Sequence, residues 1–156
     1  MKKVLFISST GGHLNELLQM KSLFPNYDYH IVTEKTQSNE NLVDTYGKNI
    51  TYLKYGTKHK LLSYIFIFLF NCIKSLFIFL KYKPDVIVST GTHTTVPMCY
   101  IAHFFKRKVI YIETFANIYT KSMAGKLVYP IADYFIVQWK SMLKLYPKAI
   151  YAGWIF

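Results

Sequence analysis

The stretch VLFISSTGGHLNELL, residues 4–18, decides the fold. Its first four residues are large and apolar, a run that is typical of a buried β-strand. Gly11 and Gly12 end this run, and Leu14, Leu17 and Leu18 then recur at the spacing of one helix face. A strand, a glycine turn and a helix in this order predict the first unit of a parallel sheet.

The same alternation continues along the rest of the chain. The sequence predicts further strands over residues 29–33, 50–53, 85–89, 109–112 and 134–137, and helices over residues 61–80, 96–105, 121–129 and 138–145. No linker rich in glycine, proline or serine divides the chain. We therefore expect an α/β protein with one Rossmann-like domain, residues 1–156, in which helices cover both faces of a parallel sheet.

The charge of the chain is strongly unbalanced. Nineteen Lys and Arg residues face eight Asp and Glu residues, and the formal net charge of +11 predicts a polyanionic partner. The interval between Asp44 and Asp85 holds seven lysines and no acidic residue, and it contains the most apolar segment of the chain. Basic residues around apolar sequence favour an anionic membrane surface over nucleic acid.

That apolar segment, LLSYIFIFLFNCIKSLFIFL at residues 61–80, is long enough to span a bilayer. Two observations argue against a spanning helix. A spanning helix would leave the first three strands and the later strands on opposite sides of the membrane, where one sheet could not form. A polar stripe also covers roughly one third of the helix circumference, and it consists of Lys60, Ser63, Tyr64, Asn71, Lys74, Ser75 and Lys81.

We therefore expect residues 61–80 to form a membrane-interfacial helix, with one edge on the sheet and the other in the bilayer. A helix buried wholly in the core is the alternative. The predicted membrane contacts are Lys60, Phe66, Phe70, Lys74, Phe77 and Lys81.

The cysteines and the N-terminus indicate the compartment. Cys72 and Cys99 lie in apolar surroundings, which favours buried thiols in a reducing cytoplasm. The apolar run at the N-terminus is too short for a signal peptide and is better explained as a strand.

Two loops at the predicted carboxyl edge of the sheet end in histidine: VLFISSTGGH and DVIVSTGTH. Ligands of open α/β sheets bind at this edge. A glycine pair before a helix leaves backbone N–H groups and the positive end of the helix dipole free for a phosphate or diphosphate, although a simple turn is the alternative. The candidate binding residues are Thr10, Gly11, Gly12, Gly91, Thr92 and His93.

Three further side chains are candidates for chemistry at that edge. His13 can act as a general base near pH 7 or donate a hydrogen bond to a phosphate, unless it only caps or packs. Glu113 follows the fifth predicted strand and can bind a sugar hydroxyl or orient an acceptor, with Asn117 sharing that role; the alternative for Glu113 is an ion pair with a lysine. Asp133 begins a strand at the opposite edge, which indicates a structural role.

Five segments together resemble a known family: STGGHLNELL, PDVIVSTGTHTTVP, IETFAN, GKLVYPIADYFIVQW and YPKAIYAGWIF. They resemble bacterial capsule and exopolysaccharide glycosyltransferase subunits related to the membrane-anchor subunit of the split UDP-GlcNAc transferase of dolichol-linked oligosaccharide synthesis. Such subunits are similar to the N-terminal, acceptor-side half of a GT-B enzyme, as in the peptidoglycan GlcNAc transferase. In that enzyme a glycine loop ending in histidine matches Gly11, Gly12 and His13, a second glycine loop matches residues 90–92, and an acidic residue matches Glu113.

The resemblance implies a subunit of an inverting GT-B hexosyltransferase that binds a polyprenyl-diphosphate-linked saccharide at the cytoplasmic face of the plasma membrane. A separate donor-binding catalytic subunit would hold most of the UDP-sugar, and this chain would need no cofactor or metal and would be inactive alone. The chain has the length of one GT-B half and starts at its first strand, so membrane contact is expected at residues 61–80. The C-terminal Trp154, Ile155 and Phe156 either dock that catalytic subunit or fold onto their own core.

Two other functions remain open. The chain could be a non-catalytic scaffold that only recruits and activates the catalytic glycosyltransferase subunit. It could also be a stand-alone nucleotide-binding Rossmann protein, which the missing G-x-G-x-x-G motif disfavours.

Overall fold

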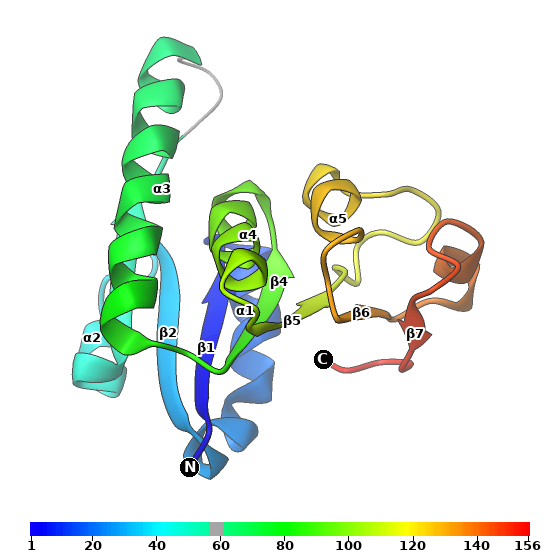
Figure 1. Ribbon diagram of the computed structural model, residues 1–156, viewed down its shortest axis with the longest axis horizontal. Coiled ribbons are helices and arrows are strands. Elements are labelled where there is room, and N and C mark those ends of the chain that lie inside the picture. Colours follow the sequence, from blue (N-terminus) through cyan, green and yellow to red (C-terminus); the bar gives the residue numbers. More distant parts are fainter. Residues whose placement is uncertain (57–60) are drawn as a thin grey trace.

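The computed structural model describes residues 1–56 and 61–156, without the side chains of residues 61 and 62, and its centre is a seven-stranded parallel sheet (Figure 1). The order β3-β2-β1-β4-β5-β6-β7 confirms the Rossmann-like α/β prediction. The strands are β1 (Lys3–Ser8), β2 (Asp28–Lys35), β3 (Ile50–Lys54), β4 (Val86–Gly91), β5 (Lys108–Ile112), β6 (Tyr134–Val137) and β7 (Ile150–Tyr151). Because the order reverses between β1 and β4, the loops after these two strands lie side by side.

The connections between the strands are helical. They are α1 (Gly12–Gln19) with η1 (Met20–Asn26), α2 (Leu42–Tyr46) with η2 (Gly47–Asn49), α3 (Leu61–Tyr82), η3 (His93–Thr95) with α4 (Val96–Phe104), α5 (Met123–Val128) and η4 (Lys140–Lys144). The sequence did not predict α2 or β7, and the helix that it predicted over residues 138–145 is present as a shorter 3₁₀ segment, Lys140–Lys144. Gln138 and Trp139 precede that segment, and their side chains donate hydrogen bonds to the backbone carbonyls of Glu113 and Phe115.

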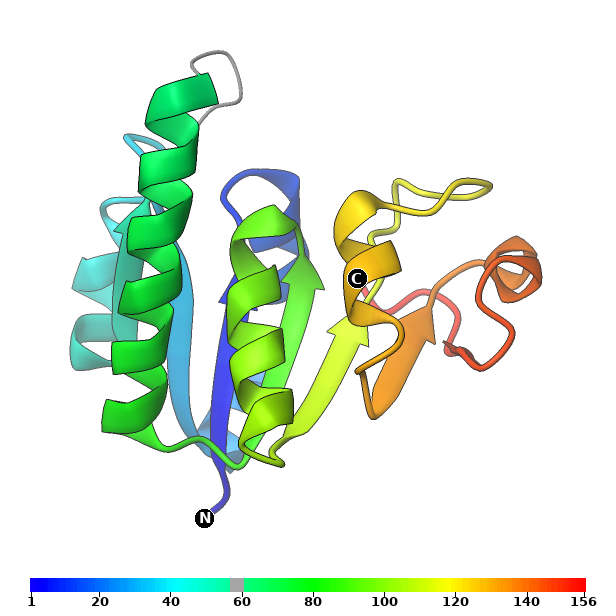
Figure 2. The same cartoon turned by 45° about the horizontal axis from the view of Figure 1, so that its top comes forward.

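The helices form two layers, one on each face of the sheet. Figure 2 shows α3, α4 and α5 in front of the strands, with α1, η1 and α2 behind them. Strand side chains alternate accordingly: Leu5 and Ile7 of β1 belong to the core under α3 to α5, whereas Val4 and Phe6 belong to the core under α1 and η1. Asp133 lies away from the carboxyl edge of the sheet, because its carboxylate accepts a hydrogen bond from Lys108 at the start of β5. This position agrees with the structural role that the sequence predicted for it.

Candidate functional site

The loops after β1 and β4 bind each other and form one surface at the carboxyl edge of the sheet. The Ser9 N–H donates to the Gly91 carbonyl at 2.7 Å, and the Thr92 N–H donates to the Ser9 hydroxyl at 3.2 Å. The Thr90 hydroxyl donates to the His13 carbonyl at 2.8 Å. The structure therefore brings together the two glycine loops that the sequence placed at one edge.

Gly91 is the point of closest approach between these loops and β5. Its φ is +94°, and a Cβ atom there would lie 2.9 Å from the Tyr111 hydroxyl and 3.5 Å from His13 Nδ1. Only glycine fits both the backbone conformation and the space. The close neighbour that excludes a side chain at residue 91 is the Tyr111 hydroxyl, whereas His13 lies at ordinary contact distance.

The protonation of His13 follows from its hydrogen bond. Its Nδ1 atom lies 2.8 Å from the Thr90 carbonyl oxygen, which can only accept, so Nδ1 carries the proton and Nε2 is the basic nitrogen. Burial lowers the pKa of His13, but the nearby negative charge of Glu16, the hydrogen bond to the Thr90 carbonyl and the charge of Glu113 outweigh burial and raise the pKa above its ordinary value of 6.5. This geometry suits a general base whose conjugate acid is stabilised.

Glu113 is buried beneath α5, where hydrogen-bond donors occupy both of its carboxylate oxygens. Oε2 accepts hydrogen bonds from the Ser122 hydroxyl at 3.0 Å and the Tyr146 hydroxyl at 2.9 Å, and Oε1 accepts the Thr114 N–H at 3.2 Å. In the described part of the chain no lysine forms an ion pair with it. Glu113 therefore braces the segment after β5, and its direct contact with a sugar or acceptor stays a prediction.

The first glycine loop is held by two buried residues that sequence reasoning missed. Glu34, at the end of β2, accepts the Thr10 N–H at 3.2 Å and the Thr94 hydroxyl at 2.6 Å, so it joins both loops. The amide of Asn39 donates to the Thr10 hydroxyl at 3.1 Å. The signal for Glu34 was the one used for Glu113, an acidic residue at the carboxyl end of a strand in a basic chain.

An open hollow lies beside this first loop. Its volume is about 520 Å³, and its lining consists of Thr10, Gly11, Thr36, Gln37, Ser38 and Tyr55. Gly11 is the N-cap of α1, and no side chain caps that helix. The first-turn N–H groups of Gly12 and His13 are therefore available to an anion.

The other predicted binding residues lie around this surface in different ways. The Thr92 hydroxyl and His93 Nδ1 are 3.0 Å apart, and His93 Nε2 lies 4.0 Å from Glu34 Oε1. The His93 ring also packs on Tyr64 of α3, with centroids 5.5 Å apart. Asn117 donates its backbone N–H to the Thr114 carbonyl at 3.2 Å. His93 thus faces α3, whereas His13 packs on the loop after β4, so the two histidines that end the glycine loops have different surroundings.

The helix α3 exposes many apolar side chains to solvent and buries two polar ones. Asn71 and Ser75 are buried, and the Asn71 amide bonds both the N–H and the carbonyl of Lys54 on the edge strand β3. The exposed residues of α3 include Ile65, Phe66, Leu69, Phe70, Ile73, Leu76, Phe77 and Leu80. By length and composition, residues 63–82 could cross a membrane, and only 17% of the most apolar window is buried.

This orientation excludes a helix buried wholly in the core. Of the predicted membrane contacts, Phe66, Phe70, Phe77 and Lys81 are exposed on α3, while Lys74 is partly buried with its Nζ atom 6.0 Å from the Phe70 ring centroid. Lys60 lies outside the described residues. Contact of these side chains with a membrane stays a prediction.

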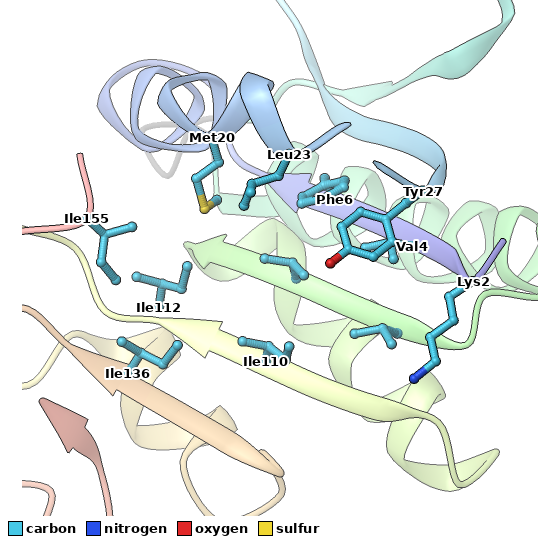
Figure 3. A pocket seen from close by; sticks show the side chains of 12 residues that line it. Lys2, Val4, Phe6, Met20, Leu23, Tyr27, Ile110, Ile112, Ile136 and Ile155 are labelled. Carbon is cyan, nitrogen blue, oxygen red and sulfur yellow. The ribbon is translucent and has the colours of Figure 1, made fainter. Parts of the chain in front are cut away.

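The opposite face of the sheet carries an apolar groove over β1, β4, β5 and β6. Figure 3 shows Ile110, Ile112 and Ile136 on the strands at its floor, with Met20 of η1 on one side and Ile155 at one end. The volume is about 390 Å³. Within the described residues, no helix covers this part of the sheet, as α4 and α5 cover the other face (Figure 2).

The C-terminal residues run along the edge of this groove. The Ile155 N–H donates to Gln138 Oε1 at 3.2 Å, and Ile155 and Phe156 pack on the core under α1 and η1. Trp154 is exposed, and its ring touches Phe115 with centroids 5.1 Å apart. Two residues of the predicted docking element thus fold onto their own chain, and one faces outward.

In residues 1–56 and 61–156, no three His, Cys, Asp or Glu side chains gather closely enough to hold an ion. The free thiols Cys72 and Cys99 are partly and fully buried, respectively, and burial raises the pKa of Cys99 to about 12.

Comparison of the sequence with known proteins identifies relatives over nearly the whole chain. The profile of a family described as "Oligosaccharide biosynthesis protein Alg14 like" matches residues 4–155. The UDP-N-acetylglucosamine transferase subunit ALG14 of Mus musculus is 28% identical over 177 residues, which cover 97% of this chain and 82% of that protein. The subunit of the same name from Candida albicans is 40% identical over 95 residues, covering 57% of this chain and 42% of that protein.

Comparison of the structure finds the same fold in larger enzymes. MurG of Acinetobacter baumannii superposes with a TM-score of 0.73 at 15% identity, over 90% of this chain and 43% of that chain. The UDP-GlcNAc 2-epimerase of Methanocaldococcus jannaschii superposes with a TM-score of 0.71 at 19% identity, over 97% of this chain and 45% of that chain. The chain thus spans less than half of these solved structures, and the likeness shows the Rossmann-like fold of a GT-B half.

Proposed function

The chain belongs to the Alg14-like family of oligosaccharide biosynthesis proteins, and we propose that it is the acceptor-binding and membrane-recruiting subunit of a two-component glycosyltransferase. In this proposal a partner subunit holds the UDP-sugar, and the acceptor is a polyprenyl-diphosphate-linked saccharide. The mouse relative is named as a subunit of a UDP-N-acetylglucosamine transferase, which supports the division into subunits.

The observation that carries the proposal is the position of His13. Its basic Nε2 belongs to a ring held at the carboxyl edge of the sheet, where the two glycine loops meet. The uncapped start of α1 and the hollow beside Thr10 and Gly11 suit the diphosphate of the acceptor. One edge thus offers both an anion site and a base.

The proposed chemistry is a single displacement that inverts the anomeric centre. His13 Nε2 takes the proton of the acceptor hydroxyl, and the hydroxyl oxygen forms a bond to the anomeric carbon of the donor sugar. The bond from that carbon to UDP breaks, and UDP leaves with its electron pair. The chain needs no cofactor of its own for these steps and has no activity without its partner.

The exposed side of α3 supports recruitment to the membrane. Many of its apolar side chains are exposed while Asn71 and Ser75 are buried, unlike a helix that buries its apolar side in a soluble core. The strands that precede and follow α3 in the chain, β3 and β4, belong to one sheet, so both ends of the helix stay on the same side of the membrane. The helix therefore rests in the interface and does not cross the bilayer. Lys74 and Lys81 border it and suit anionic headgroups. We place the complex at the cytoplasmic face of the plasma membrane, in capsule or exopolysaccharide synthesis.

The apolar groove supports docking of the donor-binding subunit. It lies on the face opposite α3, so lipids that contact α3 do not reach it (Figures 2 and 3). Its floor over four strands suits the apolar side of one helix, which would add to the helix layer on this face of the sheet. Ile155 at its end and the exposed Trp154 extend this surface toward the carboxyl edge.

Transfer by the reconstituted pair tests the proposal. The chain and a donor-binding subunit are co-expressed, and transfer from several UDP-sugars to a lipid-diphosphate acceptor is measured in membranes. His13→Ala is expected to remove transfer and to leave the complex intact, because it deletes the base and no interface. The matched control is His103→Ala, an exposed histidine on α4. Unchanged turnover of His13→Ala would favour the scaffold function instead.

A further inference from the structure

Glu16 lies one helical turn after His13 and is held by the segment that follows β5. Its Oε1 atom accepts hydrogen bonds from the Thr114 hydroxyl at 2.7 Å and the Phe115 backbone N–H at 3.1 Å. These donors are 98 and 99 residues away in sequence. Two donors on one oxygen fix the orientation of the carboxylate.

The second oxygen of this carboxylate is directed toward His13. Glu16 Oε2 lies 3.6 Å from His13 Nδ1, the ring nitrogen that carries the proton. Oε2 is shielded from solvent and accepts no hydrogen bond from any described group. A shielded carboxylate oxygen without a donor is unfavourable by itself. The nearby imidazole of His13 can stabilise this oxygen electrostatically, and most strongly when the ring is protonated.

The other titratable groups near His13 do not offer the same support. Glu113 approaches from the segment after β5, but donors occupy both of its oxygens. The Tyr111 hydroxyl approaches from β5 next to Gly91. Burial raises the pKa of Tyr111 well above its ordinary value, so this hydroxyl stays neutral. Glu16 is therefore the negative group best placed to act on the ring.

We propose that Glu16 is a positioning residue for His13: its negative charge beside Nδ1 favours the ring tautomer with the proton on Nδ1 and stabilises the imidazolium after Nε2 has taken a proton. The inference rests on the proposed function, in which that proton comes from the acceptor hydroxyl. The hydroxyl oxygen bonds the anomeric carbon, UDP leaves with the electron pair of the broken bond, and the ring becomes a cation. A fixed carboxylate beside Nδ1 lowers the free energy of that cation.

Glu16→Gln separates charge from structure. The amide oxygen can keep the hydrogen bonds from Thr114 and Phe115, while the amide nitrogen replaces Oε2 and removes the negative charge. The imidazole of His13 is titrated by NMR in the full chain without its partner. The pKa of His13 is expected to fall in Glu16→Gln and to stay unchanged in Glu40→Gln, an exposed carboxylate paired with Lys35.

Glu16→Asp retains the charge and serves where glutamine disturbs the fold. The pKa of His13 in Glu16→Asp is expected to lie between those of the wild type and Glu16→Gln. An identical pKa of His13 in the wild type and in Glu16→Gln overturns the inference, and this titration does not depend on transferase activity.

Kinetics of the reconstituted pair give the second readout. Glu16→Gln is expected to lower kcat at least about tenfold, to leave KM for the acceptor within about twofold, and to shift the acid limb of the kcat/KM profile to lower pH. If His13→Ala is inactive and Glu16→Gln keeps the wild-type kcat, the inference is wrong and the proposed function stands. If His13→Ala is fully active, the proposed function itself fails.

Discussion

Replacing three phenylalanines on the exposed side of α3 should release the protein from membranes. Phe66, Phe70 and Phe77 are 72%, 45% and 68% exposed, and they lie on the apolar side of the helix away from the sheet. Glutamine is a strong helix former, so Phe66→Gln, Phe70→Gln and Phe77→Gln together keep α3 while removing its aromatic surface. The hydrogen bonds between Asn71 and Lys54 of β3 and the buried position of Ser75 are not touched.

The exposed parts of the three rings together amount to nearly two whole phenylalanine side chains. Burial of one whole side chain is worth about 2 kcal/mol, so full insertion of these rings contributes about 4 kcal/mol. That free energy corresponds to about a thousandfold in the partition coefficient. A triple variant should therefore bind vesicles up to about a thousandfold more weakly than the wild type.

Co-sedimentation with anionic phospholipid vesicles measures this difference, at low salt and again at high salt to screen the lysines. The matched control is Leu23→Gln, which changes a side chain with 45% exposure on η1, on the opposite face of the sheet. Circular dichroism checks that α3 is retained. Equal vesicle binding by the triple variant and the wild type would refute the assignment of this surface to the membrane.

Three further predictions concern the core, the base and the groove. Gly125→Ala should lower the free energy of unfolding by about 1–3 kcal/mol in urea titrations, because a Cβ atom there would overlap Glu113 Oε2 and the Tyr146 hydroxyl; unchanged stability would contradict the packing described. The raised pKa of His13 adds stability that is fully present below the pKa of the unfolded chain and is lost as pH rises through the higher folded value. Urea titrations between about pH 6 and 8 should show this loss in the wild type and not in His13→Asn, and parallel curves would exclude it. Ile110→Glu in the groove should abolish co-purification with the donor-binding subunit without unfolding the chain, whereas Tyr119→Glu, an exposed change remote from the groove, should not; retained co-purification of Ile110→Glu would remove the partner from this face.

Local patterns were sufficient for most of the elements. The apolar run before Gly11 and Gly12 predicted β1, the leucines after it predicted α1, and the length of residues 61–80 predicted α3. The elements that were missed or misassigned are short. β7 has two residues, and the helix predicted over residues 138–145 is shortened to η4, because the side chains of Gln138 and Trp139 bond the segment after β5. Such contacts leave no periodic signal.

The candidate site was only partly predictable, because hydrogen bonds between distant residues decide it. The motif identified His13 and Gly91 as edge residues, but the proton on Nδ1 depends on the Thr90 carbonyl, 77 residues away. Glu113 and Glu16 are both acidic residues near the edge, and their spacing does not reveal which one is enclosed by donors and which one faces His13.

By itself, the sequence determined the order of strands and helices, the pairing of two glycine loops at one edge, and an apolar helix beside lysines, because all of these follow from spacing and composition along the chain. The tertiary structure decided which sides of those elements face inward. It turned Asn71 toward the free edge of β3, left the apolar side of α3 exposed, and left a groove where no described helix covers β4 to β6. The physical reason is that the burial and the hydrogen bonds of a side chain depend on the elements that pack against it, and those elements can be far away in the sequence.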